Sequence, residues 1–205
     1  MRITISDSLM DQADKRPEAE ALVYKDRSFS YASLQSEVDR LAALLLEYGL
    51  RKNDRVAVYL EKSPEEAVSL LAVNRAGGIF VDVNHQLKEP QIRHILIDSG
   101  ARFLFTSGQR CKYLANILPK CPELEKIIVH NHDQDLSIEA KELIPRGEWN
   151  QELLMPIPPR IVETDIGGII YTSGSTGRAK GVVVSQRNLT AGAESVSTYL
   201  ENTPE

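Results

Sequence analysis

One stretch near the carboxyl end does most to define this chain, and it reads Tyr171-Thr172-Ser173-Gly174-Ser175-Thr176-Gly177-Arg178-Ala179-Lys180-Gly181. Its three glycines permit positive φ angles and a close approach of the backbone to a ligand. Its hydroxyl side chains stand beside a row of backbone N–H donors, and Arg178 and Lys180 add positive charge that suits phosphate oxygens. The stretch predicts a polyphosphate cradle built from Thr172, Ser173, Gly174, Ser175, Thr176, Gly177 and Lys180.

The stretch differs from two common phosphate-binding motifs. In the pattern G-x-x-x-x-G-K-[ST] the lysine follows a glycine, whereas Lys180 follows Ala179 and precedes Gly181. Gly174 and Gly177 also lack the spacing of G-x-G-x-x-G. Composition alone would allow a plain loop, because Gly, Ser and Thr are common in loops. The order of the residues, with an apolar run on each side, favours a ligand site.

The segments beside the cradle predict how the chain enters and leaves it. Residues 166–171 have the composition of a buried strand, and residues 181–184 of a strand that leaves the loop. A helix is expected over residues 186–201. The loop would join two strands, so no helix N-terminus would supply a dipole to the phosphates.

Strands and helices alternate through the rest of the chain. Helices are expected over residues 31–48, 89–98 and 110–118, with a further helix start at Ser63 and Pro64, and strands over residues 55–60, 79–81, 102–105 and 126–129. This alternation predicts an α/β fold, layered, with a largely parallel sheet and flanking helices.

The expected domain organisation has three parts. Residues 1–130 would form a sheet-and-helix subdomain, and residues 131–163 a polar, proline-bearing connection. Residues 164–205 would contribute a strand, the phosphate loop, a second strand and a helix, and begin a second sheet layer. His130 and His132 would be solvated loop histidines, since no cysteine or histidine cluster accompanies them and no direct metal motif is present.

Charge, apolar segments and cysteine content indicate which kinds of partner and location to expect. The net charge of −5 over 205 residues argues against nucleic acid or an anionic membrane surface. No segment has the length of an apolar membrane span, and the amino terminus does not have the apolar core of a signal peptide. Cys111 and Cys121 are the only cysteines and are expected to be free thiols, which fits a cytoplasmic location.

Residues 172–181 resemble the phosphate-binding signature of the adenylate-forming superfamily, the AMP-dependent synthetases and ligases. Residues 29–34 and 75–81 resemble two earlier landmarks of the same superfamily, in the same order. The resemblance implies an ATP-dependent, AMP-forming acyl-CoA (acid-thiol) ligase that activates a carboxylic acid as acyl-adenylate. It implies ATP and Mg as cofactors, with CoA in the full-length parent. Lys180 would stabilise charge on the pyrophosphate, and Thr176 would lie near Mg or phosphate oxygens.

A narrower resemblance comes from residues 80–84, 94–102 and 191–202, which are similar to AMP-forming acyl-CoA ligases associated with bacterial exosortase loci. The chain departs from the superfamily at Asp82, His85 and Ala179, where proline is usual, and at Gln186, where histidine is usual. Two alternatives stay open. The chain could be a fragment of a peptide synthetase adenylation domain, or a non-catalytic truncated module that acts by protein association.

The resemblance also sets an expectation about length. The chain ends at Glu205, before the segments that form the acyl pocket and the adenosine site in this superfamily. An amino-terminal fragment, inactive alone, is therefore expected. Apolar surface left uncovered in such a fragment would favour self-association.

Overall fold

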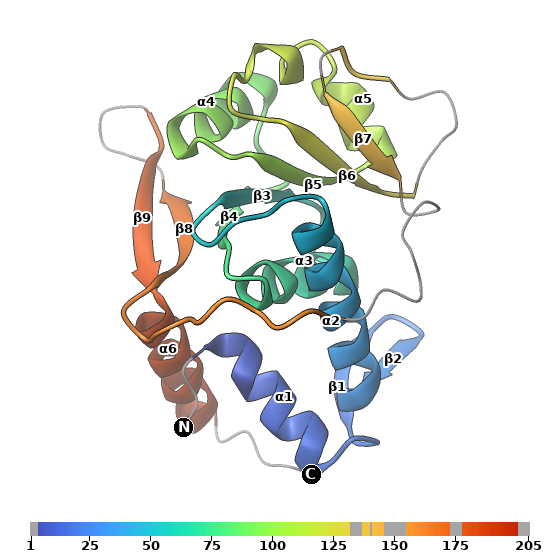
Figure 1. Ribbon diagram of the computed structural model, residues 1–205, viewed down its shortest axis with the longest axis vertical. Helices are drawn as coiled ribbons and strands as arrows, with labels where there is room; N and C mark the ends of the chain where they lie inside the picture. Colours follow the sequence, from blue (N-terminus) through green and yellow to red (C-terminus); the bar gives the residue numbers. More distant parts are fainter. Residues whose placement is uncertain (1–3, 132–136, 140, 146–154, 173–177, 201–205) are drawn as a thin grey trace.

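Helices cover both faces of a single seven-stranded sheet in the computed structural model (Figure 1). The structure describes residues 4–131, 137–139, 141–145, 155–172 and 178–200. Within them the elements are, in chain order, α1 (Ile5–Lys15), β1 (Glu20–Tyr24), β2 (Arg27–Ser30), α2 (Tyr31–Glu47), β3 (Arg55–Tyr59), α3 (Pro64–Arg75), β4 (Ile79–Asp82), α4 (Glu89–Ser99), β5 (Phe103–Ser107), α5 (Gly108–Leu114), the 3-10 turn η1 (Leu118–Lys120), β6 (Lys126–His130), β7 (Glu142–Pro145), β8 (Ile166–Thr172), β9 (Lys180–Ser185) and α6 (Gln186–Tyr199).

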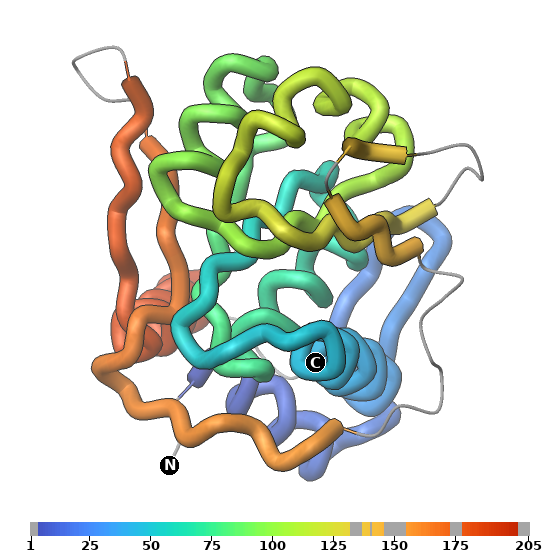
Figure 2. Tube along the Cα trace, turned by 45° about the horizontal axis from the view of Figure 1, so that its top comes forward, coloured from blue at the N-terminus to red at the C-terminus, as the bar shows by residue number. Residues whose placement is uncertain are grey.

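The strand order across the sheet is β7-β6-β5-β3-β4-β8-β9. Every neighbouring pair is parallel except β8 with β9, which form an antiparallel hairpin at one edge. Figure 2 shows this hairpin standing at the side of the molecule. The short hairpin β1–β2 lies outside the sheet and packs near α2. The predicted α/β class, with a largely parallel sheet and flanking helices, is confirmed.

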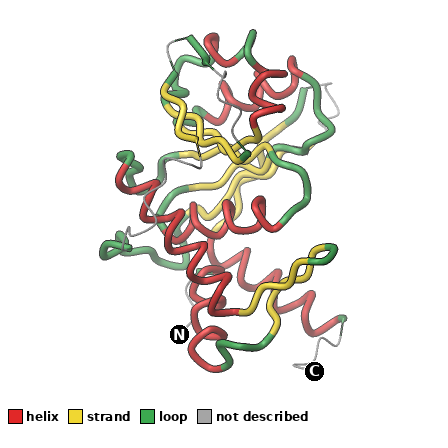
Figure 3. The backbone as a smooth tube through the Cα atoms, turned by 90° about the vertical axis from the view of Figure 1, so that its right-hand side faces the viewer, coloured by secondary structure: helices red, strands yellow, loops and turns green. Residues whose placement is uncertain are grey.

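Alternating side chains divide the core into two layers, one on each face of the sheet. Val56 and Val58 of β3 pack with α2 and α3, whereas Ala57 and Tyr59 pack with α4 and α5. These central strands are almost continuously apolar, as expected for strands that are covered on both faces. Figure 3 shows the sheet between its two helical layers. Among the described residues, no helix is both long and apolar enough to cross a membrane.

Helix ends follow the local sequence. The Ser63 hydroxyl accepts a hydrogen bond from the backbone of Glu66 at 3.3 Å, and Pro64 occupies the first turn of α3. Gly49 follows α2 with φ of 83°, a conformation that glycine adopts without strain. The predicted start of α3 and end of α2 are therefore confirmed.

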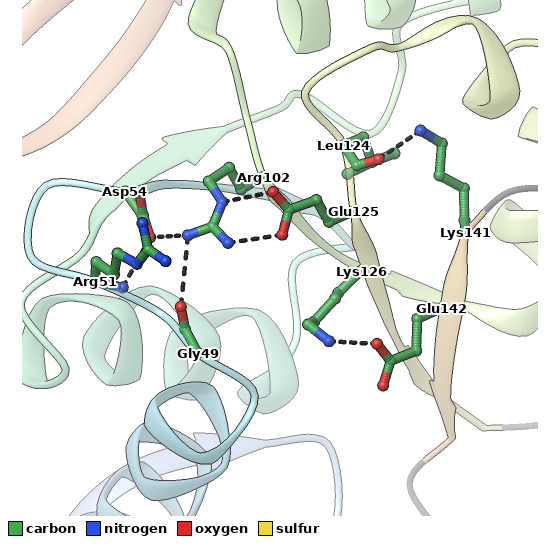
Figure 4. A network of polar contacts seen from close by, with 9 residues as sticks. All are labelled: Gly49, Arg51, Asp54, Arg102, Leu124, Glu125, Lys126, Lys141 and Glu142. Carbon is green, nitrogen blue, oxygen red and sulfur yellow. Dashed lines mark hydrogen bonds and ion pairs between the residues drawn. The ribbon is translucent and has the colours of Figure 1, made fainter.

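An ion-pair network joins the strands at their amino ends (Figure 4). Arg102, just before β5, binds both oxygens of Glu125 at 3.0 and 2.6 Å and also pairs with Asp54 before β3. The hydrogen bonds to Glu125, followed by the charge of Asp54, raise the pKa of Arg102. Lys126 and Glu142 pair between β6 and β7. The amino ends of these strands, here called the amino edge of the sheet, are thus occupied by ion pairs between structural residues.

The structure corrects three expectations about secondary structure and sheet arrangement. Residues 164–205 do not begin a second sheet layer, because β8 pairs in parallel with β4 and extends the same sheet. The connection over residues 131–163 contains the edge strand β7, whose four residues include a proline and gave little strand signal. The helix expected over residues 110–118 is shorter, spanning Gly108–Leu114.

His130 is also different from expectation. It is buried at the end of β6, with its ring centroid 6.1 Å from that of Phe105, rather than solvated in a loop. His132 lies outside the described residues. Cys111 and Cys121 are buried free thiols, as predicted, and burial raises the pKa of Cys111 to about 11.

The Gly168→Ala substitution should destabilise the fold by about 1–3 kcal/mol, because a Cβ at this position would lie 2.4 Å from the ring of Phe80. Urea unfolding followed by circular dichroism would measure the change. Gly192→Ala is the matched control, since a Cβ there meets nothing within 4 Å and helix α6 should gain about 0.5–1 kcal/mol. Equal effects of the two substitutions would contradict this packing argument.

Candidate phosphate-binding site

The predicted cradle lies at the tip of the β8–β9 hairpin. The strand register pairs Thr172 with Lys180 and Tyr171 with Gly181, so the described ends of the cradle face each other. Ser173, Gly174, Ser175, Thr176 and Gly177 lie outside the described residues. Their predicted contacts with phosphate therefore stay predictions. The expected strand-to-strand connection is confirmed, because β8 leads into β9.

The cationic side chains at this tip face solvent. Arg178 and Lys180 are exposed, as is Thr172 across the hairpin. Within the described part of the chain, neither cation has a hydrogen bond or an ion pair with another side chain. No described side chain therefore neutralises either charge.

Gly181 lies inside β9, which confirms the strand expected over residues 181–184. It does not have the positive φ angle that a glycine of the cradle could adopt. A Cβ there would lie 2.8 Å from Cγ2 of Ile169 and 3.2 Å from the ring of Tyr171. Glycine at 181 thus permits close packing across the hairpin.

Buried amides hold the base of β8. The side chain of Asn74, fully buried on α3, donates to the carbonyl of Gly167 at 2.7 Å. Gln186, at the start of α6, is also buried, and a Cβ added at Gly167 would lie only 3.0 Å from its Nε2. The ladder between β8 and β9 shifts register here, between Ile166 and Gly168. Gln186 therefore fills the position where the superfamily usually has histidine by packing against β8.

A cavity of about 690 Å³ lies beside the hairpin tip. Thr172 and Ala179 line one side, and Lys62, Asp82 and His85 line another. Thr172 and Asp82 end the parallel strands β8 and β4, so the cavity is at the carboxyl edge of the sheet. Ligands of open α/β sheets bind at this edge, opposite the ion-pair network described above.

Lys62 and Asp82, which line one side of the cavity, belong to a charged trio with Glu66. Nζ of Lys62 lies 2.8 Å from Glu66 and 3.8 Å from Asp82. The hydrogen bond to Glu66 is the main cause of the raised pKa of Lys62, with the charge of Asp82 adding to it. Oδ1 of Asp82 is buried and has no hydrogen-bond partner among the described residues.

The segment around His85 is held through its backbone. Nη1 of Arg110 donates to the carbonyl of His85 at 3.0 Å, and the guanidinium lies over the ring of Tyr59, 4.6 Å from its centroid. These contacts fix the chain beyond β4, where it lines the cavity.

A family model for AMP-binding enzymes matches residues 9–204. The chain belongs to this family. The match confirms the resemblance to adenylate-forming enzymes stated from residues 172–181. The narrower resemblance to exosortase-associated ligases stays a prediction.

Relatives of this AMP-binding chain include peptide synthetases. It is 33% identical over 180 residues to a dimodular nonribosomal peptide synthase of Bacillus subtilis (strain 168), covering 87% of this chain and 7% of that protein. It is 29% identical over 189 residues to tyrocidine synthase 3 of Brevibacillus parabrevis, covering 91% of this chain and 3% of that protein. The chain thus spans a small part of these relatives.

Solved structures with the same fold include CoA ligases. A putative long-chain-fatty-acid CoA ligase from Rhodopseudomonas palustris superposes with a TM-score of 0.84 at 24% identity, covering 98% of this chain and 49% of that one. The N-terminal subdomain of NpsA from Klebsiella oxytoca, in complex with 3-hydroxybenzoyl-AMSN, gives a TM-score of 0.68 at 26% identity. That match covers 91% of this chain and 42% of that one.

The sequence analysis does not predict the trio of Lys62, Glu66 and Asp82 beside the cavity, and it names Asp82 only as a departure from proline. The position of Asp82 at the end of a buried strand was the available signal, because polar residues at that position line the carboxyl edge of the sheet.

The Asn74→Ala substitution should lower the free energy of unfolding by about 1–3 kcal/mol, because it removes a buried donor from the Gly167 carbonyl. Urea denaturation would measure this loss. Gln35→Ala is the control, since the Gln35 amide reaches Asp39 only at 3.5 Å on a partly exposed helix face. An Asn74→Ala protein as stable as the Gln35→Ala control would contradict the anchoring role.

Proposed function

We propose that the protein binds ATP at the β8–β9 hairpin and takes part in forming an acyl-adenylate from a carboxylic acid. One observation carries the proposal. In a chain of the AMP-binding family, the exposed residue Lys180 pairs across the hairpin with Thr172, and Thr172 and Ala179 line a cavity at the carboxyl edge of the sheet. A triphosphate along this tip would meet exposed cations and small polar groups.

Lys180 is the proposed catalytic residue. Adenylation transfers AMP to the carboxylate and releases pyrophosphate, so negative charge grows on the β- and γ-phosphates as the bond to the α-phosphate breaks. A fixed ammonium beside those phosphates would stabilise that charge. Thr176 and its neighbours in residues 173–177 are proposed to complete the cradle through hydroxyls and backbone N–H groups.

Mg²⁺ is proposed to enter with the nucleotide, where it supplies screening of the phosphate charge. The described residues contain no cluster of three or more His, Cys, Asp or Glu side chains that would hold a metal ion alone. The chain's own part is to bind the nucleotide: Lys180 and Arg178 contribute charge, and Thr172 contributes a hydroxyl.

The acyl acceptor is proposed to be a thiol, with CoA as the first candidate. The fold likeness to CoA ligases supports it. A second candidate is amino acid adenylation, as in a peptide synthetase. The peptide synthetases among the sequence relatives, with up to 33% identity over 180 residues, favour that alternative.

The Lys180→Ala substitution should slow carboxylate-dependent exchange of pyrophosphate into ATP about tenfold or more, because about 1.4 kcal/mol of transition-state stabilisation corresponds to that factor. The exchange would be measured with radiolabelled pyrophosphate in the full-length parent protein. Lys120→Ala is the control, since this lysine is exposed and lies outside the hairpin. Unchanged exchange in Lys180→Ala would remove Lys180 from the mechanism.

The acid class is tested by the same exchange with three separate pools: fatty acids, aromatic acids and the common amino acids. A CoA ligase should respond to a fatty or aromatic acid and form a thioester when CoA is added, detected by mass spectrometry. Exchange that responds to amino acids alone, with no CoA thioester, would favour the adenylation-domain alternative. No exchange with any pool by the full-length protein would count against the proposed adenylation.

A further inference from the structure

Helix α4 contacts the chain on each side of residues 173–177, at Tyr171 and at Ala179. Its residue His94 lies 3.0 Å through Nε2 from the carbonyl oxygen of Ala179, just before β9. Its residue Asp98 accepts a hydrogen bond from the hydroxyl of Tyr171 in β8, at 2.6 Å through Oδ2. His94 and Asp98 are four residues apart and therefore lie on one face of α4.

We propose that His94 and Asp98 are positioning residues that fix the two ends of the phosphate-binding stretch against α4. The inference rests on the proposed function, because it gives these side chains a purpose in nucleotide binding. Neither residue would touch the nucleotide. They would act through Tyr171 and Ala179, and so set the separation and orientation of the strands that present Lys180.

The chemistry of these contacts suits a fixed attachment. A hydroxyl donating to a carboxylate is a short, charge-assisted hydrogen bond. Because the Ala179 carbonyl can only accept, His94 donates from Nε2. The His94 and Tyr171 rings also meet edge to face, with centroids 6.5 Å apart at 83°. Burial, followed by the bond to Asp98, raises the pKa of Tyr171, so the phenol keeps its proton and stays a donor.

Helix α4 is itself anchored in the core. Ile92, Ile95 and Leu96 are at most 1% exposed and pack against the sheet. The side chain of Tyr171 packs on the same core cluster. The hydrogen bonds therefore connect the hairpin to a rigid part of the molecule.

The contact from His94 also restrains the backbone at Ala179. Ala179 imposes no φ restraint of the kind a proline ring would. The bond from His94 to its carbonyl oxygen orients this peptide immediately before Lys180. Lys180 and Arg178 take no part in either contact, so their charges remain available to phosphate.

The test compares four variants of the intact protein. Tyr171→Phe and His94→Phe keep an aromatic ring but lose the donor, whereas His94→Gln keeps an amide donor. Tyr31→Phe is the control, since it removes another partly buried tyrosine hydroxyl, which contacts Arg16 at 3.3 Å far along the sequence from the hairpin. Calorimetric titration with Mg·ATP and with inorganic tripolyphosphate, together with amide hydrogen exchange of residues 171–181, would be measured for each.

Tyr171→Phe and His94→Phe should each weaken binding of both probes about three- to tenfold, the effect of one lost hydrogen bond. Amide exchange over residues 171–181 should become faster in both. His94→Gln should retain most of the affinity, and Tyr31→Phe should match the unmodified protein. Rescue by the amide donor would separate positioning from simple packing.

Two results would overturn the positioning role. One is unchanged amide exchange in Tyr171→Phe and His94→Phe, and the other is an equal loss in His94→Gln and His94→Phe. If the unmodified protein binds neither probe, the proposed nucleotide binding fails instead. The exchange measurement still decides whether α4 holds the hairpin, so the two failures are distinguishable.

Discussion

The contact between Phe80 and Gly168 is the constraint on which the candidate site depends. Phe80 of β4 lies beside residue 168 of β8, and its ring occupies the space where any larger side chain at 168 would point. The missing side chain lets β8 pair in parallel with β4. Through this pairing the hairpin becomes part of the main sheet. Its tip then lies at the same edge as Asp82 and the segment around His85.

The amino and carboxyl edges of the sheet, where the parallel strands begin and end, differ in how their charged side chains are paired. At the amino edge, charges are paired with one another: Arg102 holds Glu125 and Asp54, and Lys126 holds Glu142. At the carboxyl edge, Lys62 pairs with Glu66 and Asp82, whereas Lys180 has no ion-pair partner within the described residues. A charge without a protein partner can be neutralised by a ligand.

Support for the hairpin comes from both faces of the sheet. On one face, Asn74 of α3 binds the carbonyl of Gly167 at the base of β8. On the other, Asp98 and His94 of α4 bind the hairpin near its tip. A hairpin at the edge of a sheet has a neighbouring strand on one side only. Side-chain contacts from two helices add support at Gly167, Tyr171 and Ala179.

The alternation of strands and helices can be predicted from the sequence, because apolar periodicity, caps such as Ser63 and the helix end at Gly49 are local signals. The phosphate-binding stretch is a prediction of the same kind, since its residue types and their order lie in one continuous segment. The folded chain was needed to show that β8 joins the first sheet, that Gly181 serves packing, and that His94 lies beside Ala179. These depend on contacts between distant segments, such as the one between Asn74 and Gly167, which are 93 residues apart. No local pattern encodes such contacts, because strand order is set by which apolar surfaces fit together once the chain has folded.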